Sequence, residues 1–133
     1  METVVVAHGQ AIVEGRKTAI LTAATIQDQY SMDGLWNSVN DGWDHGIAVD
    51  AVQHFGRHQL ATFDIIKVEA LETMHPVCLV RIDEIRMMDC AALEDGEITA
   101  LGYDSREEFM SEFMSDWANR RGWYMDITFI SER

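Results

Sequence analysis

The apolar residues in the last third of the chain change their spacing near Gly122. Before this glycine, large apolar side chains recur every fourth position, which is the period of one face of a helix. These are Phe109, Phe113 and Trp117, joined by Met110 and Met114. From Trp123 to Phe129, apolar and polar residues alternate, which is typical of a half-buried strand. The pattern predicts a helix that ends at Gly122 and a strand that completes a sheet, in an α+β fold.

Shorter patterns divide the rest of the chain, and its 133 residues suit one domain with a sizeable core, residues 1–133. We expect strands at 3–7, 17–24, 65–71 and 77–85, and helices at 8–14, 90–100 and 105–121. Residues 30–45 carry clusters of turn-forming residues and predict a loop, with at most a short helix at 35–39. Residues 47–58 place apolar residues on a rough helical face.

The stretch Gly15-Arg16-Lys17-Thr18 lies where the first helix should end. Glycine tolerates the positive φ that follows a helix C-terminus, so Gly15 is expected to turn the chain toward the sheet. Two cations and a hydroxyl at this edge suit an anionic or carbonyl-bearing ligand. They could equally satisfy the last carbonyls of the helix and its dipole. At such an edge we expect Lys17 to keep its ammonium in water while its stem covers apolar surface.

Together with Gly102-Tyr103-Asp104-Ser105-Arg106-Glu107-Glu108-Phe109 and the last strand, this stretch resembles an ASCH domain of the PUA-like superfamily. The resemblance covers nearly the whole chain in the expected order. It implies a β-barrel of about five or six strands with flanking helices, and a cleft that meets RNA or modified nucleosides in relatives. It makes Arg16, Lys17 and Thr18 the expected ligand-binding residues, with Tyr103 lining the same cleft.

Catalysis is not expected. In relatives that hydrolyse acetylcytidine, the resemblance implies a catalytic lysine, a threonine three residues later and a glutamate near the later glycine. This chain has Lys17, but Ile20 stands at the threonine position and Leu101 at the glutamate position. Because isoleucine has no hydroxyl, a hydrolase would need Thr18 or Thr22 in its place.

The net charge of −13 bears on the partners of the protein. Binding to phosphates depends on lysine and arginine, so we expect no tight binding of duplex DNA. Arg16-Lys17 and Arg120-Arg121 are the local basic groups. The leading hypothesis is a binding module for a nucleotide, nucleoside or short RNA. The alternatives are an acidic module that contacts a basic protein, and a hydrolase that uses Lys17.

We expect neither a metal nor another cofactor. His54 and His58 have the spacing of two ligands on one helix face, but Gly56 weakens that helix and satisfied histidines are the commoner case. Cys78 and Cys90 are expected to be buried apolar residues. Trp36 and Trp43 could stack on a base or close one end of the barrel. No apolar run approaches the roughly 20 residues of a membrane span, and the basic start of a signal peptide is missing, so we expect a cytoplasmic protein.

Overall fold

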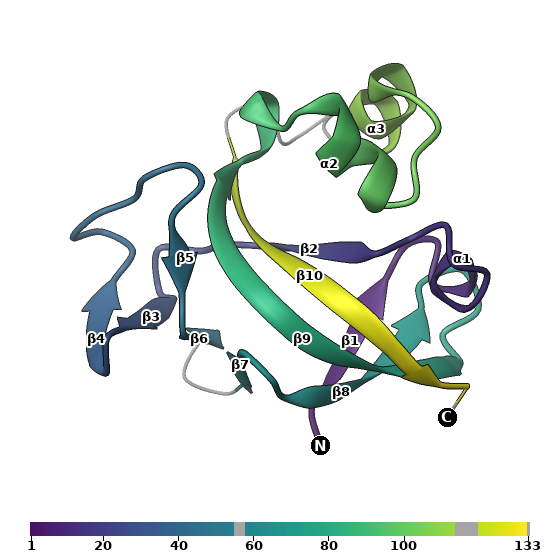
Figure 1. The fold of residues 1–133 in the computed structure, drawn as a ribbon. Coiled ribbons are helices and arrows are strands. Elements are labelled where there is room, and N and C mark those ends of the chain that lie inside the picture. The colour runs from purple at the N-terminus through teal and green to yellow at the C-terminus, as the bar shows by residue number, and fades with distance from the viewer. Residues whose placement is uncertain (55–57, 114–119, 133) are drawn as a thin grey trace.

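Two long antiparallel strands, β9 (Pro76–Asp89) and β10 (Arg121–Ser131), form the centre of the fold (Figure 1). The computed structural model describes residues 1–54, 58–113 and 120–132. The other strands are β1 (Thr3–Val6), β2 (Ala19–Ala23), β3 (Gln29–Met32), β4 (Leu35–Ser38), β5 (Ala48–Val49), β6 (Ala51–His54), β7 (His58–Ala61) and β8 (Ile65–Ala70). The helices are α1 (Gln10–Val13), a 3-10 turn η1 (Cys90–Ala92), α2 (Asp95–Ala100) and α3 (Arg106–Phe113).

The larger sheet has the order β1-β8-β9-β10-β2, and the two-residue strand β5 also pairs with β9 as a sixth strand outside this order. Strands β8 and β9 alternate between buried and more exposed residues. In β8, Ile66, Val68 and Ala70 point into the core. In β9, Val80 and Ile82 are fully buried, and Arg81 between them is exposed. The sheet is antiparallel apart from β1, which runs parallel to β8. The strands expected near 3–7, 17–24, 65–71 and 77–85 are therefore confirmed.

A second sheet of order β4-β3-β6-β7 replaces the loop and helix that the sequence predicted for 30–45 and 47–58. Asp33 and Gly34 both adopt positive φ, at 53° and 82°, and make the tight turn between β3 and β4. The apparent helical spacing of Val49 and Val52 has another cause. The two valines belong to different strands, β5 and β6, because the chain changes sheets at Asp50.

The helix expected at 90–100 is shorter than predicted. Its first part is the turn η1, and α2 begins only at Asp95 behind a capping box made by Glu94 and Glu97. Asp89, the residue before η1, makes no side-chain cap, and its carboxylate accepts a hydrogen bond of 3.0 Å from the indole of Trp43. None of the helices in the described residues is long and apolar enough to cross a membrane.

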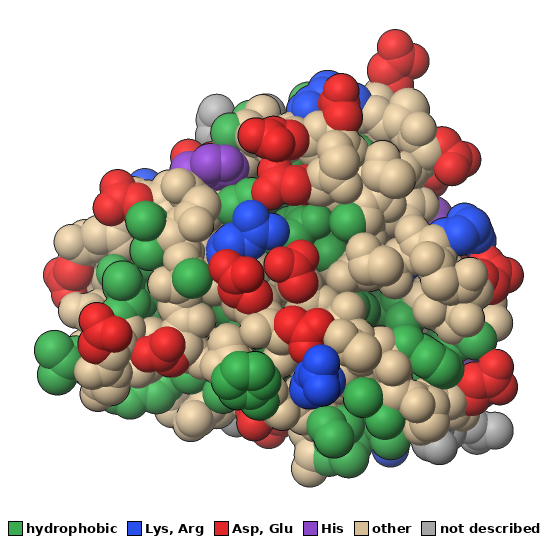
Figure 2. Space-filling model, in the orientation of Figure 1, with side chains coloured by type: hydrophobic (Ala, Val, Ile, Leu, Met, Phe, Trp, Pro, Cys, Tyr) green, Lys and Arg blue, Asp and Glu red, His purple; other side chains and the backbone are tan. Residues whose placement is uncertain are grey.

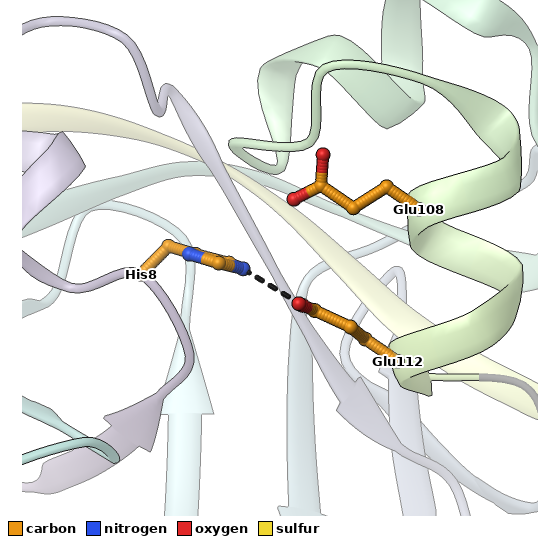
Figure 3. Close-up of side chains that lie close together, drawn as sticks. All are labelled: His8, Glu108 and Glu112. Atoms are coloured by element: carbon orange, nitrogen blue, oxygen red, sulfur yellow. Dashed lines mark hydrogen bonds and ion pairs between the residues drawn. The ribbon is translucent and has the colours of Figure 1, made fainter.

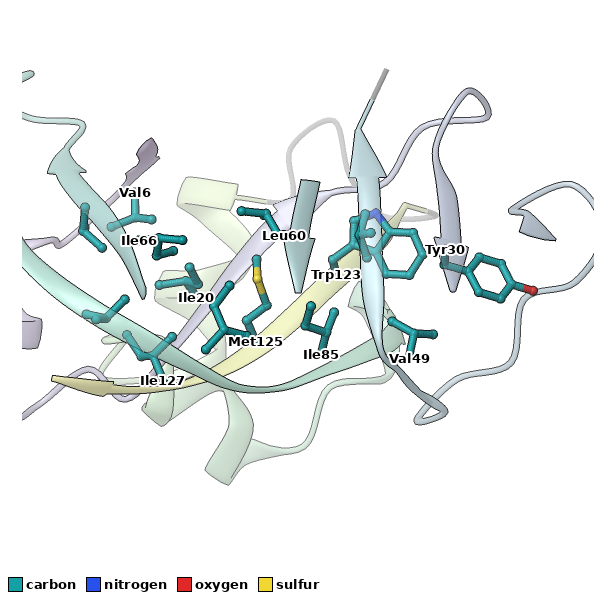
Figure 4. Close-up of a cluster of buried hydrophobic side chains, with 14 of the residues drawn as sticks. Val6, Ile20, Tyr30, Val49, Leu60, Ile66, Ile85, Trp123, Met125 and Ile127 are labelled. Carbon is teal, nitrogen blue, oxygen red and sulfur yellow. The ribbon is translucent and has the colours of Figure 1, made fainter. Parts of the chain in front are cut away.

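Strand β10 is buried on both faces and joins two core clusters. Trp123, Met125 and Ile127 lie in a cluster that combines residues of both sheets (Figure 4). Tyr124, which the alternation placed on the polar face, is buried in a second cluster under α2 and α3. Phe129 is 41% exposed, so the expected inward alternation ends before it.

The helical stripe is confirmed only in part. Phe109 is fully buried, whereas Met110 is 39% exposed and does not face the core. The side chain of Phe113, and Met114 and Trp117, lie outside the described residues. Gly122 is not a helix end: it lies within β10, where an added Cβ would come 2.6 Å from the Leu21 side chain. This close approach to β2 explains the glycine.

The architecture is α+β, with many strands and few helices. Within the described ranges, the larger sheet keeps β1 and β2 as its two edges, and the two sheets do not close into a barrel. The expected barrel is therefore not shown. Helices α2 and α3 lie together above one end of β9 and β10, and α1 connects the two edge strands (Figure 1).

Candidate functional site

A cleft of about 610 Å³ lies beside the two edge strands β1 and β2. Apolar side chains of both strands form part of its wall, together with Leu71 from the turn after β8. Its polar side chains come from five separate segments of the chain. They are His8, Lys17, Thr22, Glu72, Tyr103 and Glu112. A concave, largely apolar surface with a few converging polar groups is the usual form of a small-molecule site.

The turn at Gly15 places Lys17 in this cleft. Helix α1 ends at Val13, and Gly15 has a φ of 79°, as the sequence predicted. The backbone N–H groups of Arg16 and Lys17 both donate to the carbonyl of Ala11, which directs the Lys17 side chain inward. Its ammonium donates a hydrogen bond of 2.5 Å to the carbonyl of Leu101, and the residue is only 5% exposed. The expectation that this ammonium stays in water is therefore wrong.

A second turn, at Gly102, holds Tyr103 against the same cleft. Gly102 has a φ of 97°, and an added Cβ would lie 3.5 Å from side-chain atoms of both Lys17 and His8. The Tyr103 ring contacts His8 and Phe109 edge-on, with ring centroids 5.0 and 5.3 Å apart. Tyr103 and Lys17, far apart in the sequence, thus line one cleft.

Two side chains that line the cleft, Lys17 and Tyr103, have pKa values shifted from those usual for their residue types. Burial lowers the pKa of Lys17 from 10.5 to about 8, although the nearby Glu72 carboxylate opposes this change. Burial, assisted by Glu112, Glu108 and Glu72, raises the pKa of Tyr103 to about 12. Near neutral pH the tyrosine is therefore a hydroxyl donor, and a minor fraction of the lysine is a neutral amine. Perturbed groups of this kind are concentrated at functional sites.

His8 links the two sides of the cleft. It adopts a positive φ of 59°, and its backbone N–H donates to Glu72 Oε1 at 2.9 Å. Its ring Nε2 lies 3.1 Å from Oε2 of Glu112 on α3 (Figure 3). The contact joins residues 104 positions apart in the chain. His8, Glu72 and Glu112 were all missed by the sequence reasoning, because only the pairing of β1 with β8 and the position of α3 bring them together.

The structure separates the four predicted ligand-binding residues into two pairs. Lys17 and Tyr103 line the cleft. Arg16 is exposed and pairs with Glu14. Thr18 is exposed too, and its backbone N–H donates to the Ala100 carbonyl. Neither Arg16 nor Thr18 lines the cleft. A ligand-binding role for any of the four remains a prediction.

The other candidate residues lie elsewhere. His54 and His58 are opposite each other on β6 and β7, and not on one helix, and His54 Nδ1 lies 2.9 Å from the buried Asp28 carboxylate. Trp36 is 45% exposed on β4, whereas Trp43 packs on Trp123 in the core. The two tryptophans therefore do not form one stacking surface. Cys78 and Cys90 are buried as expected, and burial raises the pKa of both thiols.

The lowered pKa of Lys17 predicts a pH dependence of stability. Between about pH 8 and 10.5 the folded chain has lost this proton while the unfolded chain still binds it, so the free energy of unfolding should rise with pH. Below pH 8 both states are charged, and the burial cost is fully present. In urea titrations, the free energy of unfolding of wild type, relative to that of Lys17→Met, should rise by about 1–2 kcal/mol between pH 8 and 9.5. A difference independent of pH would contradict the burial of this ammonium.

Comparison with known proteins identifies one similar fold. No protein-family model matches the chain, and no curated protein sequence matches it. The structure is similar to the crystal structure of protein EF3133 from Enterococcus faecalis V583, which is described under the family model DUF984. The TM-score is 0.55 at 13% sequence identity, and the match covers 100% of this chain and 83% of EF3133. At this identity the likeness shows a shared fold only.

Proposed function

We propose that the cleft binds a nucleoside, with Lys17 and Tyr103 as hydrogen-bond donors. The observation that carries this proposal is the buried Lys17 ammonium in the wall of an open cleft. The Leu101 carbonyl accepts one of its three protons, so donor capacity remains for a carbonyl on a ligand. Apolar side chains such as Leu21 and Leu71 offer a surface for a flat base.

The charges around the cleft favour an uncharged ligand over a nucleotide or short RNA. The carboxylates of Glu72 and Glu112 both line the cleft, and phosphate groups there would be repelled. Arg16, the cation that could have bound a phosphate, lies outside it and pairs with Glu14. Of the ligands considered from the sequence, a neutral nucleoside therefore fits these groups best.

The ASCH-like, PUA-like assignment belongs to the same proposal. The two glycine turns that carry the resemblance lie side by side: Thr18 N–H donates to the Ala100 carbonyl at 2.8 Å, and a Cβ added at Gly102 would lie 3.5 Å from the Lys17 side chain. This arrangement supports a common origin of the cleft with that family, including its RNA-binding members. A PUA-like ancestry of the fold and a cytoplasmic location are part of the proposal, and the resemblance and the composition support them.

A hydrolase of the acetylcytidine type is the second candidate, and the position of Glu72 favours it. In the resemblance to the ASCH family, Leu101 occupies the position of the catalytic glutamate. Glu72, however, lines the cleft and lies close enough to Lys17 to influence its pKa. Thr22 also lines the cleft, whereas Thr18 does not. A lysine with a pKa of about 8, a carboxylate and a hydroxyl could together serve an attack on an amide carbonyl.

Titration of the purified protein with nucleosides tests the leading proposal. Isothermal calorimetry would compare cytidine, adenosine and acetylcytidine with the matching 5′-monophosphates. We expect saturable binding of at least one nucleoside, tighter than that of its monophosphate. Binding of monophosphates alone would indicate a phosphate site outside this cleft, and binding of neither class would overturn the proposal. Release of acetate from acetylcytidine, followed by chromatography, would decide in favour of the hydrolase.

The acidic surface predicts weak binding of polynucleotides. Figure 2 shows Asp and Glu side chains spread over one face of the molecule, with few basic groups between them. With a net charge of −13, random duplex DNA or long RNA should not bind with sub-micromolar affinity at physiological salt. A filter-binding assay measures this directly, and tight binding that falls steeply with added salt would contradict it. The same surface could instead attract a basic protein, the remaining alternative.

A further inference from the structure

We propose that His8, Glu108 and Glu112 bind a divalent transition-metal ion at the rim of the cleft. The proposal goes beyond nucleoside binding, because a metal can bind here without any nucleoside. Among the residues that the structure describes, these three form the one group of His, Cys, Asp or Glu ligands close enough together to hold an ion. Each offers one ligand atom, and the three atoms lie within 4.8 Å of one another.

The geometry requires little movement. An ion equally distant from three atoms at this spacing would lie at most about 2.8 Å from each, so shifts below about 1 Å give bonds of roughly 2.0–2.2 Å. Glu108 and Glu112 are one turn apart on α3, and His8 approaches them from the other side (Figure 3). The ring of His8 is held edge-on against Tyr103, and its backbone is held by Glu72. Two separate parts of the chain, the turn after β1 and helix α3, thus bring the three ligand atoms together.

The charges at this position favour a cation. Two glutamates four residues apart on a helix repel each other. The Glu72 carboxylate, which accepts from the His8 backbone N–H, adds a third carboxylate nearby. The hydrogen bond between His8 and Glu112 offsets part of this repulsion in the absence of metal. Glu108 Oε2 also accepts from the Asp104 N–H at 3.2 Å, and a carboxylate has a second oxygen for the ion. A divalent cation would neutralise both ligating glutamates.

The ligand set indicates the class of ion. One imidazole and two carboxylates suit Zn²⁺ or Mn²⁺, whereas Mg²⁺ and Ca²⁺ prefer oxygen ligands alone. Three protein ligands leave a coordination position open, as in metal sites that bind a water or a substrate. Because His8 and Glu112 also line the cleft, the ion would lie beside the space where the proposed ligand would bind.

Calorimetric titration of the chelator-treated full chain with metal chlorides tests the proposal without a nucleoside. We expect Zn²⁺ or Mn²⁺ to bind with one-to-one stoichiometry and more tightly than Mg²⁺ or Ca²⁺. The variants His8→Ala and Glu112→Gln should each raise the Kd roughly tenfold or more, since the first removes a ligand and the second replaces a charged carboxylate ligand by a neutral amide. Glu112 is exposed, so its variant should fold even if a change at His8 disturbs the turn.

Two control variants match the test variants in residue type. Glu107→Gln changes an exposed glutamate on the same helix, and His75→Ala changes an exposed histidine outside the cluster. Both should bind metal as wild type does. The proposal would be overturned by the absence of saturable Zn²⁺ or Mn²⁺ binding, or by unchanged affinity in Glu112→Gln. Equal binding of Ca²⁺ and Zn²⁺ that His8→Ala does not weaken would also overturn it, since carboxylates alone would then explain the binding.

Discussion

Replacing Trp123 with alanine should lower the free energy of unfolding by about 3–5 kcal/mol, the range for deleting a large buried aromatic side chain. Trp123 is 1% exposed and packs between Trp43 and Tyr30, with ring centroids 4.9 and 6.0 Å away. Its indole N–H also donates to the fully buried Asp28 carboxylate at 2.8 Å. The substitution would therefore leave a cavity between the two sheets and remove a donor from a buried charge.

Urea denaturation followed by circular dichroism measures this effect, and two further variants interpret it. Trp123→Phe keeps most of the packing but loses the hydrogen bond, so it should be intermediate. Trp36→Ala removes a tryptophan that is 45% exposed on β4, and should change stability by no more than about 1 kcal/mol. Equal stability of Trp123→Ala and Trp36→Ala would show that the sheets do not meet at Trp123.

The strands of the larger sheet could be predicted from the sequence because each has one consistently buried face. The alternation in β8 and β9 follows from this arrangement, and burial confirms it for Val68, Val80 and Ile82. The second sheet could not be predicted, because its strands are short and the chain passes from the larger sheet to the second sheet at Asp50. Their apolar residues are too few to show a period of two. The burial of Tyr124 could not be predicted either. Helices cover the second face of β10, and a strand that is buried on both faces no longer alternates between apolar and polar residues.

The candidate site was predictable only where local backbone conformation decides it. A glycine after a short helix indicated the turn that leads to Lys17, and the glycine before Tyr103 indicated the second turn. Glu72 and Glu112 gave no such signal. Each is an ordinary exposed acid in the sequence, and becomes part of the cleft only through contacts with His8 over 64 and 104 positions. The depth of Lys17 was also unpredictable, because it depends on the Leu101 carbonyl 84 positions away.

Replacing Lys17 with methionine should weaken nucleoside binding by about 1.5–3 kcal/mol, the range for a hydrogen bond made by a charged donor. This corresponds to a rise in Kd of roughly tenfold to 150-fold. At pH 7 the free energy of unfolding should not fall, because the burial cost of the charged ammonium is present below pH 8 and the variant removes it. Methionine fills a similar volume, and the lost bond to the Leu101 carbonyl is offset by removal of a buried ammonium.

The adjacent cation provides the matched control for this prediction. Arg16→Met removes the same charge one residue earlier, but Arg16 is exposed and outside the cleft, so nucleoside affinity should not change. Calorimetry on both variants separates the local role of Lys17 from a general effect of net charge. Equal weakening in the two variants would place the ligand on the outer surface of the turn at Gly15. If wild type hydrolyses acetylcytidine and Lys17→Met does not, the lysine acts in catalysis, and the binding-only function is wrong.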